Sequence, residues 1–336
     1  MPDRSIRPLA LLVVAQVLLV GALLTWAALG FPMPAALTGA DARTPPGTSA
    51  SPRSSEPMSA AANRSRAPRP TANRFNSRRA FALLREQVKR YGWRPAGSAT
   101  LRRLALRLRS LLPRGRLERV PGHRGLRNVV GSIPGRGKAI VVGAHYDVEA
   151  QPEGFVGAND GAAGTAAVVW LARALKRAPR RQRDRPVRFV LFDGEEEPAG
   201  CDDARFEQCA LRGSKAYARR HGDDVHRLVL LDYIAEKRGL SFEREGNSDK
   251  RMWRMLRAAA RDVGVGRLFP ARDAKVALID DHTPFLDRGI PAIDVIDFDY
   301  PAADTLQDTL DKVSRRSLDA VGEAVFLLVS RLRRRG

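Results

Sequence analysis

The chain has 336 residues, an apolar content of 44% and a formal net charge of +21. This apolar content is that of a globular protein with a core, which excludes a chain that is disordered throughout. A strongly basic chain suits nucleic acid, anionic lipid or a cell-wall polymer as partner. However, no aromatic residue interleaves with the arginines between Arg102 and Arg127, and no nucleic-acid motif is present, so we expect no specific binding of nucleic acid.

The N-terminal residues 1–31 read as a membrane-targeting segment. Residues 8–31 are almost uninterruptedly apolar and follow Arg4 and Arg7. About 20 apolar residues span a bilayer, whereas the apolar part of a cleaved signal has roughly 7–15. We therefore expect a signal-anchor, with a cleaved signal peptide as the alternative. The arginines favour a cytoplasmic N-terminus, which predicts a single-pass protein of the cell membrane with its remainder outside the cytoplasm, or a secreted protein if the segment is cleaved.

Residues 32–72 are rich in Pro, Ser and Arg and lack an apolar period, so they read as a disordered linker before one domain at 73–336. Apolar patterns predict its elements. In chain order these are helices at 78–91 and 97–112, a strand at 139–144, a helix at 162–175, a strand at 187–192, a helix at 214–220, strands at 228–231 and 240–245, a helix at 250–263, a strand at 292–296 and a helix at 317–331.

Buried strands that alternate with helices predict an α/β fold. We expect a three-layer α/β/α sandwich with a mostly parallel, mixed central sheet, in a chain that is a monomer. In such sheets ligands gather at the carboxyl ends of the strands.

Polar motifs stand at these strand ends. His145 and Asp147 follow the first strand, two residues apart, so their side chains should point the same way. Asp160 opens a glycine-rich loop into a helix, where a carboxylate can bridge two metal ions. Glu195 and Glu196 are adjacent and should point apart, so that one can bind metal while the other moves a proton. Together with Asp232 after the third strand, they predict a metal site for hydrolytic or acyl-transfer chemistry.

Each motif also has a plainer interpretation. A His-x-Asp pair can be an ordinary hydrogen bond, acidic triplets usually face solvent, and Asp280, Asp281 and His282 could cap a helix that begins near Pro284. The joint occurrence of the motifs, in order after strands, favours the functional interpretation. Other catalytic signatures are missing, because the sequence has no His-Glu-x-x-His, no Gly-x-Ser-x-Gly and no phosphate loop.

Two cysteines, Cys201 and Cys209, lie eight residues apart in an acidic insertion at 197–210. In an oxidising compartment they can form a local disulfide, and otherwise they are two thiols. Their spacing does not match a zinc knuckle.

Seven motifs together resemble metallopeptidase family twenty-eight, which holds zinc aminopeptidases and glutaminyl-peptide cyclotransferases. The resemblance covers residues 75–332, and its motifs are Gly143-Ala144-His145-Tyr146-Asp147, Gly157-Ala158-Asn159-Asp160-Gly161, Phe192-Asp193-Gly194-Glu195-Glu196, Leu211-Arg212-Gly213-Ser214, Leu231-Asp232, Asp281-His282-Thr283-Pro284-Phe285 and Gly289-Ile290-Pro291. It implies a zinc-exopeptidase-like fold. Phe155-Val156-Gly157-Ala158, the insertion 197–210 and Ile296-Asp297-Phe298-Asp299-Tyr300-Pro301 are similar to the bacterial glutaminyl-cyclase-like branch, whereas the helix start at 161–164 is closer to the aminopeptidases.

The resemblance implies roles for individual residues. Asp160 and Glu196 would bind metal, and Glu195 would be the general acid and base. His145 and Asp232 would hold a second metal in a di-zinc aminopeptidase, or orient substrate in a mono-zinc cyclotransferase. Asp280 would join the hydrogen-bond network of the cyclotransferases, beside His282 of the same motif.

The family's remaining ligand, a histidine before Thr-x-x-Asp-Thr, is replaced here by Asp304. Asp binds zinc at about the same distance as His, roughly 2.0–2.2 Å, but its side chain is shorter. Three carboxylates leave a site of net charge −1 and shift the preference from zinc toward harder ions such as manganese, magnesium or calcium. The expected cofactor is therefore one or two Zn²⁺, with a harder divalent ion as the alternative.

Two functions on peptide or protein N-termini follow from the resemblance. In the leading hypothesis the chain is a zinc-dependent glutaminyl-peptide cyclotransferase that forms pyroglutamate and releases ammonia, with Glu195 moving protons and with Asp232 and Asp280 aiding the relay. In the second it is a zinc aminopeptidase in which Glu195 activates water. A third hypothesis, from a different class, is a membrane-tethered binding module whose site has degenerated.

Overall fold

The computed structural model describes residues 65–201 and 203–334. Six strands form one sheet in the order β1-β2-β4-β3-β5-β6. Their bounds are β1 Arg116–Arg119, β2 Arg127–Ile133, β3 Ala139–His145, β4 Val187–Phe192, β5 Val225–Asp232 and β6 Ala292–Ile296. The pairs β3–β4, β3–β5 and β5–β6 are parallel, whereas β1–β2 and β2–β4 are antiparallel. The sheet is therefore mixed, with a parallel half that comes from the alternating part of the sequence.

Helices connect and cover these strands. The longer ones are α3 Ser77–Glu86, which continues into a π-helical turn at Gln87–Tyr91, α4 Ala99–Leu111, α5 Ala162–Arg177, α7 Arg212–His221, α8 Lys250–Asp262 and α10 Arg315–Leu332. Short segments are α6 Phe206–Cys209, α9 Thr283–Leu286 and the 3₁₀ turns Asp203–Arg205, Gly222–Asp224 and Gly266–Leu268. Ser98 caps α4 and Asp249 caps α8, each accepting a backbone N–H of the first turn.

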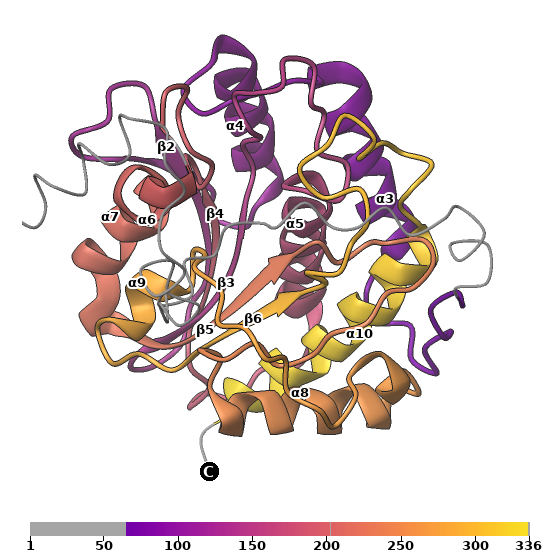
Figure 1. Cartoon of the computed structure of the whole chain (residues 1–336). Coiled ribbons are helices and arrows are strands. Elements are labelled where there is room, and N and C mark those ends of the chain that lie inside the picture. The colour runs from indigo at the N-terminus through magenta and orange to yellow at the C-terminus, as the bar shows by residue number, and fades with distance from the viewer. Residues whose placement is uncertain (1–64, 202, 335–336) are drawn as a thin grey trace, which may run out of the picture. The chain divides into compact units, whose positions relative to one another are not determined.

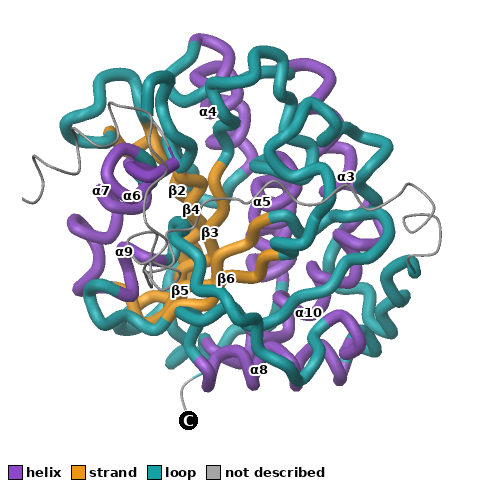
Figure 2. Tube along the Cα trace, viewed as in Figure 1, coloured by secondary structure: helices purple, strands orange, loops and turns teal. Residues whose placement is uncertain are grey.

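Alternating side chains on the strands build two cores, one on each face of the sheet. In β3, Ile140 and Val142 belong to the core under α3, α4, α5, α8 and α10, whereas Val141 belongs to the core under α7 and α9. Figure 1 shows these two groups of helices on either side of the strands, and Figure 2 shows the sheet between them. The expected three-layer arrangement with a mixed sheet is therefore present in the described residues.

Parallel register brings the strand ends together at one edge. His145 is level with Phe192 at the ends of β3 and β4, and Asp232 is level with Ile296 at the ends of β5 and β6. The residues that follow these four strands must therefore meet at the same edge, although they are far apart in the sequence.

The strand expected at 240–245 is wrong, because that segment is irregular and only Arg244 forms an isolated bridge, to Asp273. Conversely, β1 and β2 were not predicted. β1 is a four-residue strand of mostly charged residues, and β2 carries Asn128 and Gly131, so neither shows an apolar run. Gly131 is needed because a Cβ there would lie 2.8 Å from Cβ of Leu112.

The segment 8–31, expected to enter the membrane, lies outside the described residues. Within 65–201 and 203–334 no helix combines the length and apolarity that a membrane crossing requires. Residues 65–72, the end of the expected linker, contact the domain, since Ala67 is buried and the Thr71 N–H donates to Val263 O.

Candidate metal centre and pocket

One pocket of about 760 Å³ opens at the carboxyl edge of the parallel strands. The sequence-predicted residues that line it are His145, Asp160, Glu195, Glu196, Asp232, Asp280 and Asp304. His282 does not line it and is fully buried. The pocket also has apolar walls, to which Ile296 and Phe298 contribute.

Three metal donors converge at the bottom of this pocket. One ligand atom each from His145, Asp160 and Glu196 lies within 4.8 Å of the others, and all three residues are buried. His145 Nε2 is 3.0 Å from Asp160 Oδ1 and 3.4 Å from Asp232 Oδ1. One imidazole and two carboxylates are a donor set that zinc accepts, and His145 directs Nε2 at Asp160 while Nδ1 faces the carboxylate of Asp147. The residues present therefore fit a divalent metal ion.

Glu195 lies beside this group. Its Oε2 is 3.8 Å from His145 Nδ1. Both adjacent glutamates, Glu195 and Glu196, line the pocket. Burial raises the pKa of the Glu195 carboxyl well above its ordinary value. His145 opposes the shift and Asp280 adds to it. A raised pKa keeps a carboxyl able to give and take a proton near neutral pH, as a general acid and base must.

Burial and neighbouring charges also shift the pKa of two further groups in the pocket, Asp232 and His145. Burial raises the pKa of Asp232 to about 7, against the hydrogen bond from His145. Burial alone would lower the pKa of His145, but the carboxylates of Asp147, Asp160 and Asp232 raise it well above its ordinary value.

The loop that carries Asp160 is held by buried polar groups that the sequence did not single out. The guanidinium of Arg94 is fully buried and donates to the carbonyls of Tyr146, Val156 and Gly157. Burial lowers its pKa to about 10, and Asp160 opposes that shift. Nothing in the sequence distinguishes Arg94 from the other basic residues.

Asp308 holds the same loop from the opposite direction. Its buried carboxylate accepts the backbone N–H groups of Asn159 and Asp160 at 2.9 Å, and Tyr300 donates its hydroxyl at 2.7 Å. The Asn159 side chain in turn accepts the N–H of Ala235. Asp308 belongs to the motif Thr-x-x-Asp-Thr, so the sequence did contain a signal for it. Only Asp304, the residue before this motif, was expected to have a role.

Asp147 and Arg212 position the loop of the two glutamates. The carboxylate of Asp147 accepts the N–H groups of Glu195 and Glu196 at 3.4 and 3.3 Å. Arg212, the first residue of α7, donates to the carbonyl of Glu196 at 2.6 Å. Oδ1 of Asp147 is 3.8 Å from Nδ1 of His145, so the two side chains lie on the same side of the chain, as expected.

Asp304 lines the pocket but is not in the converging group. Its Oδ1 is 2.6 Å from the hydroxyl of Tyr233, which is also 3.0 Å from Asp160 Oδ2. A hydroxyl has one proton and can donate to one of these carboxylates at a time. Both Tyr233 and Asp304 have positive φ, 45° and 55°. This backbone conformation is an outlier for tyrosine and marks a constrained site.

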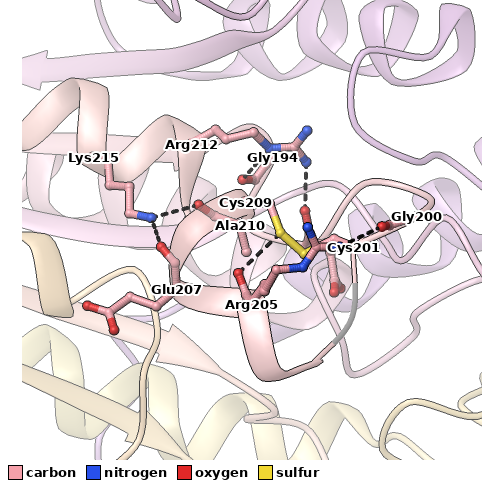
Figure 3. The surroundings of a disulfide bond; sticks show 10 residues. Gly194, Gly200, Cys201, Arg205, Glu207, Cys209, Ala210, Arg212 and Lys215 are labelled. Carbon is pink, nitrogen blue, oxygen red and sulfur yellow. Dashed lines mark hydrogen bonds between the residues drawn. A yellow bond between two sulfur atoms is a disulfide. The ribbon is translucent and has the colours of Figure 1, made fainter.

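The insertion 197–210 forms one wall of the pocket through Cys201 and Phe206. Cys201 and Cys209 form a disulfide, with their Cα atoms 6.6 Å apart. Figure 3 shows this disulfide beside Arg212, and Lys215 donates to Ala210 O at the end of the same loop. The disulfide is thus present, and it closes the loop next to the pocket.

The motif of Asp280, Asp281 and His282 does not cap α9 with its side chains. α9 begins at Thr283 with Pro284 in its first turn, and no side chain accepts a hydrogen bond from that turn. The plainer interpretation of this motif is therefore wrong, because Asp281 and His282 are fully buried and Asp280 lines the pocket.

Comparisons with known proteins agree with this arrangement. Residues 128–329 match the model of peptidase family M28. The chain is 27% identical over 206 residues to aminopeptidase YwaD of Bacillus subtilis, covering 56% of this chain and 40% of that protein. It is 27% identical over 250 residues to the glutaminyl-peptide cyclotransferase of Bos taurus, covering 62% and 66%. The chain thus spans less than two-thirds of the length of these two relatives.

Solved structures match over nearly their whole length. The glutaminyl cyclase of an Acidobacteriales bacterium superimposes with a TM-score of 0.67 at 26% identity, covering 79% of this chain and 97% of that one. The glutaminyl cyclase of Porphyromonas gingivalis superimposes with a TM-score of 0.66 at 26% identity, covering 78% of this chain and 100% of that one. A Zn-dependent exopeptidase of Parabacteroides distasonis superimposes with a TM-score of 0.64 at 25% identity, covering 76% of this chain and 98% of that one.

Proposed function

Because the chain belongs to peptidase family M28, we propose that it is a zinc-dependent glutaminyl-peptide cyclotransferase. The observation that carries the proposal is the group of His145, Asp160 and Glu196 in one pocket, with Glu195 adjacent. The match to bacterial glutaminyl cyclases over 97–100% of their length supports this branch of the family.

The metal would be held by Asp160, Glu196 and His145, and we propose Asp304 as a further ligand, because its carboxylate shares a hydroxyl partner with Asp160. When bound, zinc supplies polarisation of the γ-carbonyl of an N-terminal glutamine. Zinc fits the family, and a harder ion is the alternative because three carboxylates favour it.

Glu195 performs the proton transfers in this proposal. Its carboxylate accepts a proton from the α-amine as the amine nitrogen bonds to the carbonyl carbon (Cδ) of the side-chain amide. The carboxylic acid then returns the proton to the amide nitrogen as its bond to Cδ breaks and ammonia departs. Asp232 orients the amine, since its carboxylate lines the pocket beside His145. Asp280 lies near enough to raise the pKa of Glu195 and so keeps the proton available.

A specific feature favours the aminopeptidase as second candidate. His145 Nε2 lies 3.0 Å from Asp160 Oδ1 and 3.4 Å from Asp232 Oδ1, and these three side chains could hold the second ion of a two-metal peptidase. In that case the substrate is any peptide N-terminus and the product is a free amino acid.

Product analysis of the zinc-loaded full-length chain separates these functions. With a glutaminyl-peptide we expect ammonia and a pyroglutamyl product in equal amounts, and no release of leucine from a leucyl-peptide. The Glu195→Gln variant should lose about 10²–10⁴-fold in kcat/KM, whereas Glu197→Gln, a neighbouring pocket residue outside the proton path, should retain it. Free leucine or glutamine as product contradicts the cyclotransferase. Turnover that Glu195→Gln leaves unchanged contradicts the role of Glu195 in both enzymes, and no turnover of either peptide by the zinc-loaded wild type favours a binding module.

We also propose that the domain works outside the cytoplasm, tethered by residues 8–31 or secreted. The disulfide Cys201–Cys209 supports this location, because structural disulfides persist in oxidising compartments. Protease treatment of intact cells should remove a tethered domain and leave a cytoplasmic one untouched.

A further inference from the structure

A second buried group of metal donors lies behind the pocket. Asp280 and His282 precede α9, and Asp294 is the third residue of β6. One ligand atom from each lies within 4.8 Å of the others. Asp294 and His282 are fully buried, and Asp280 is 6% exposed at the pocket wall.

The donors of this group lack the hydrogen-bond partners that buried polar atoms need. Both carboxylate oxygens of Asp294, both ring nitrogens of His282 and Oδ2 of Asp280 have none. More than nine in ten buried polar groups in folded proteins are paired, and an unpaired buried carboxylate is costly. Five unpaired atoms on three converging side chains therefore indicate that something else binds among them.

Glu245 backs the histidine of this group. Its Oε2 accepts the N–H groups of Asn247 and Leu278 at 2.7 and 3.3 Å, which leaves Oε1 facing His282 Nε2 at 3.5 Å. Metal-binding histidines commonly direct their other ring nitrogen at a carboxylate, which fixes the ring and its tautomer. Nδ1 of His282 is then the nitrogen free to bind.

We propose that Asp280, His282 and Asp294 bind a divalent transition-metal ion of the zinc type, separate from the ion in the pocket. Donor atoms about 2.0–2.2 Å from one ion are at most roughly 4.4 Å apart, so a shift of a few tenths of an ångström completes the present geometry. Two carboxylates and an imidazole suit Zn²⁺ better than Mg²⁺ or Ca²⁺, which prefer oxygen alone.

The ion balances the charge of the two carboxylates and at the same time gives His282 Nδ1 a partner. A proton shared between Asp280 and Asp294 would serve those two side chains but leave His282 Nδ1 without a partner. Asp280 borders both the pocket and this group, so the inner ion holds Asp280 in place beside the pocket. The proposal does not depend on which reaction the pocket catalyses.

Metal counting on variants of the full-length chain tests the site. After saturation with Zn²⁺ and removal of the excess, Asp294→Asn should hold one zinc fewer per chain than the wild type. Asn has the shape of a protonated Asp. If Asp280 and Asp294 share a proton and bind no ion, Asp294→Asn should therefore lose no zinc. Asp297→Asn, the same substitution at a buried position three residues along the chain and outside the group, should keep the full content.

Glu196→Gln separates this site from the pocket. It should lower the pocket's zinc and abolish turnover while the ion that depends on Asp294 is retained. If Asp294→Asn keeps all the zinc that the wild type holds, the proposal is overturned, whatever the outcome of the activity assays.

A crystal of the zinc-loaded wild type gives the answer even if Asp294→Asn does not fold. We expect an anomalous zinc peak between Asp280, His282 and Asp294 in addition to the one at Asp160 and Glu196. A peak at the pocket alone overturns the inner site, and a peak at the inner site alone supports it while contradicting the proposed pocket metal.

Discussion

The two loops that bring carboxylates to opposite sides of the pocket are held very differently. Asp160 is buried, and its loop is fixed by the guanidinium of Arg94 and the carboxylate of Asp308. Asp304 is exposed, has a positive φ, and contacts the site through the hydroxyl of Tyr233. The Asp160 side is thus preorganised by buried groups that need no metal, whereas the Asp304 side is exposed and reaches the site through a hydroxyl group.

This difference bears on the replaced histidine. The Asp160 side chain is buried on a loop that is fixed through its backbone, so a larger ligand there would have to displace its neighbours. A ligand on the Asp304 loop can change at lower cost, because that residue is exposed to solvent. The departure from the family pattern therefore falls where the structure constrains the side chain least.

The largest expected difference is in kcat/KM, between a variant that removes the carboxylate charge of Asp160 and one that removes the charge of Asp304. Asp160→Asn should lower kcat/KM on the order of 10³-fold, equivalent to the several kcal/mol that a bound metal contributes. Asp304→Asn should lower it only about 10–100-fold, because the other three proposed donors still hold the ion and the amide oxygen of Asn can bind it weakly. Steady-state kinetics with a glutaminyl-peptide measures both, and equal losses would show that the two carboxylates have the same role.

Arg94→Met tests whether the Asp160 loop is held without metal. The substitution keeps the bulk of the side chain but leaves several buried carbonyls unpaired, so the free energy of unfolding should fall by about 3 kcal/mol or more. Arg102→Met is the matched control, because the Arg102 guanidinium is exposed and donates to Gly97 O alone; it should change stability by less than about 1 kcal/mol. Urea unfolding in the presence of chelator gives both values, and a small effect at Arg94 would mean that metal fixes the loop.

The parts of the fold that sequence patterns predicted are those with long apolar runs. β3, β4 and β6 are short buried runs, whereas α5 and α10 are apolar stretches of 16 and 18 residues, and this length distinguishes them from strands. β1 and β2 pair antiparallel at one edge through charged and small residues, and their strand character comes from tertiary partners.

The site was predictable where chemistry follows a strand directly, and not where it depends on contacts between distant segments. His145, Glu195 and Asp232 stand at strand ends, so topology alone places them together. Arg94 reaches Gly157 and Asp308 reaches Asn159 across many intervening residues. Such long-range hydrogen bonds leave no periodic signal, and the roles of Arg94 and Tyr233 could be seen only in the structure.

Asp308→Asn should have a smaller effect than Arg94→Met. The amide retains one acceptor oxygen for the N–H groups of Asn159 and Asp160 but loses the charge that strengthens those bonds. We expect stability to fall by about 1–3 kcal/mol and zinc affinity to fall with it, because the Asp160 backbone is less well held. Asp311→Asn, the same change on an exposed neighbouring residue, should leave thermal unfolding and zinc titration unchanged; a matching loss there would indicate a general effect of charge.

Asp304→His restores the residue type of the family and should have the smallest effect, in the opposite direction. Histidine tolerates positive φ better than most residues, so the loop can keep its backbone. An imidazole in place of the third carboxylate brings the donor set to zero net charge with the ion and favours zinc over harder ions. Competition between Zn²⁺ and Mn²⁺, followed by metal content and turnover, should shift toward zinc by about tenfold or less, the lower end of the range for groups that support a ligand. An unchanged metal preference would mean that residue 304 lies outside the coordination sphere, and that His145, Asp160 and Glu196 hold the ion without it.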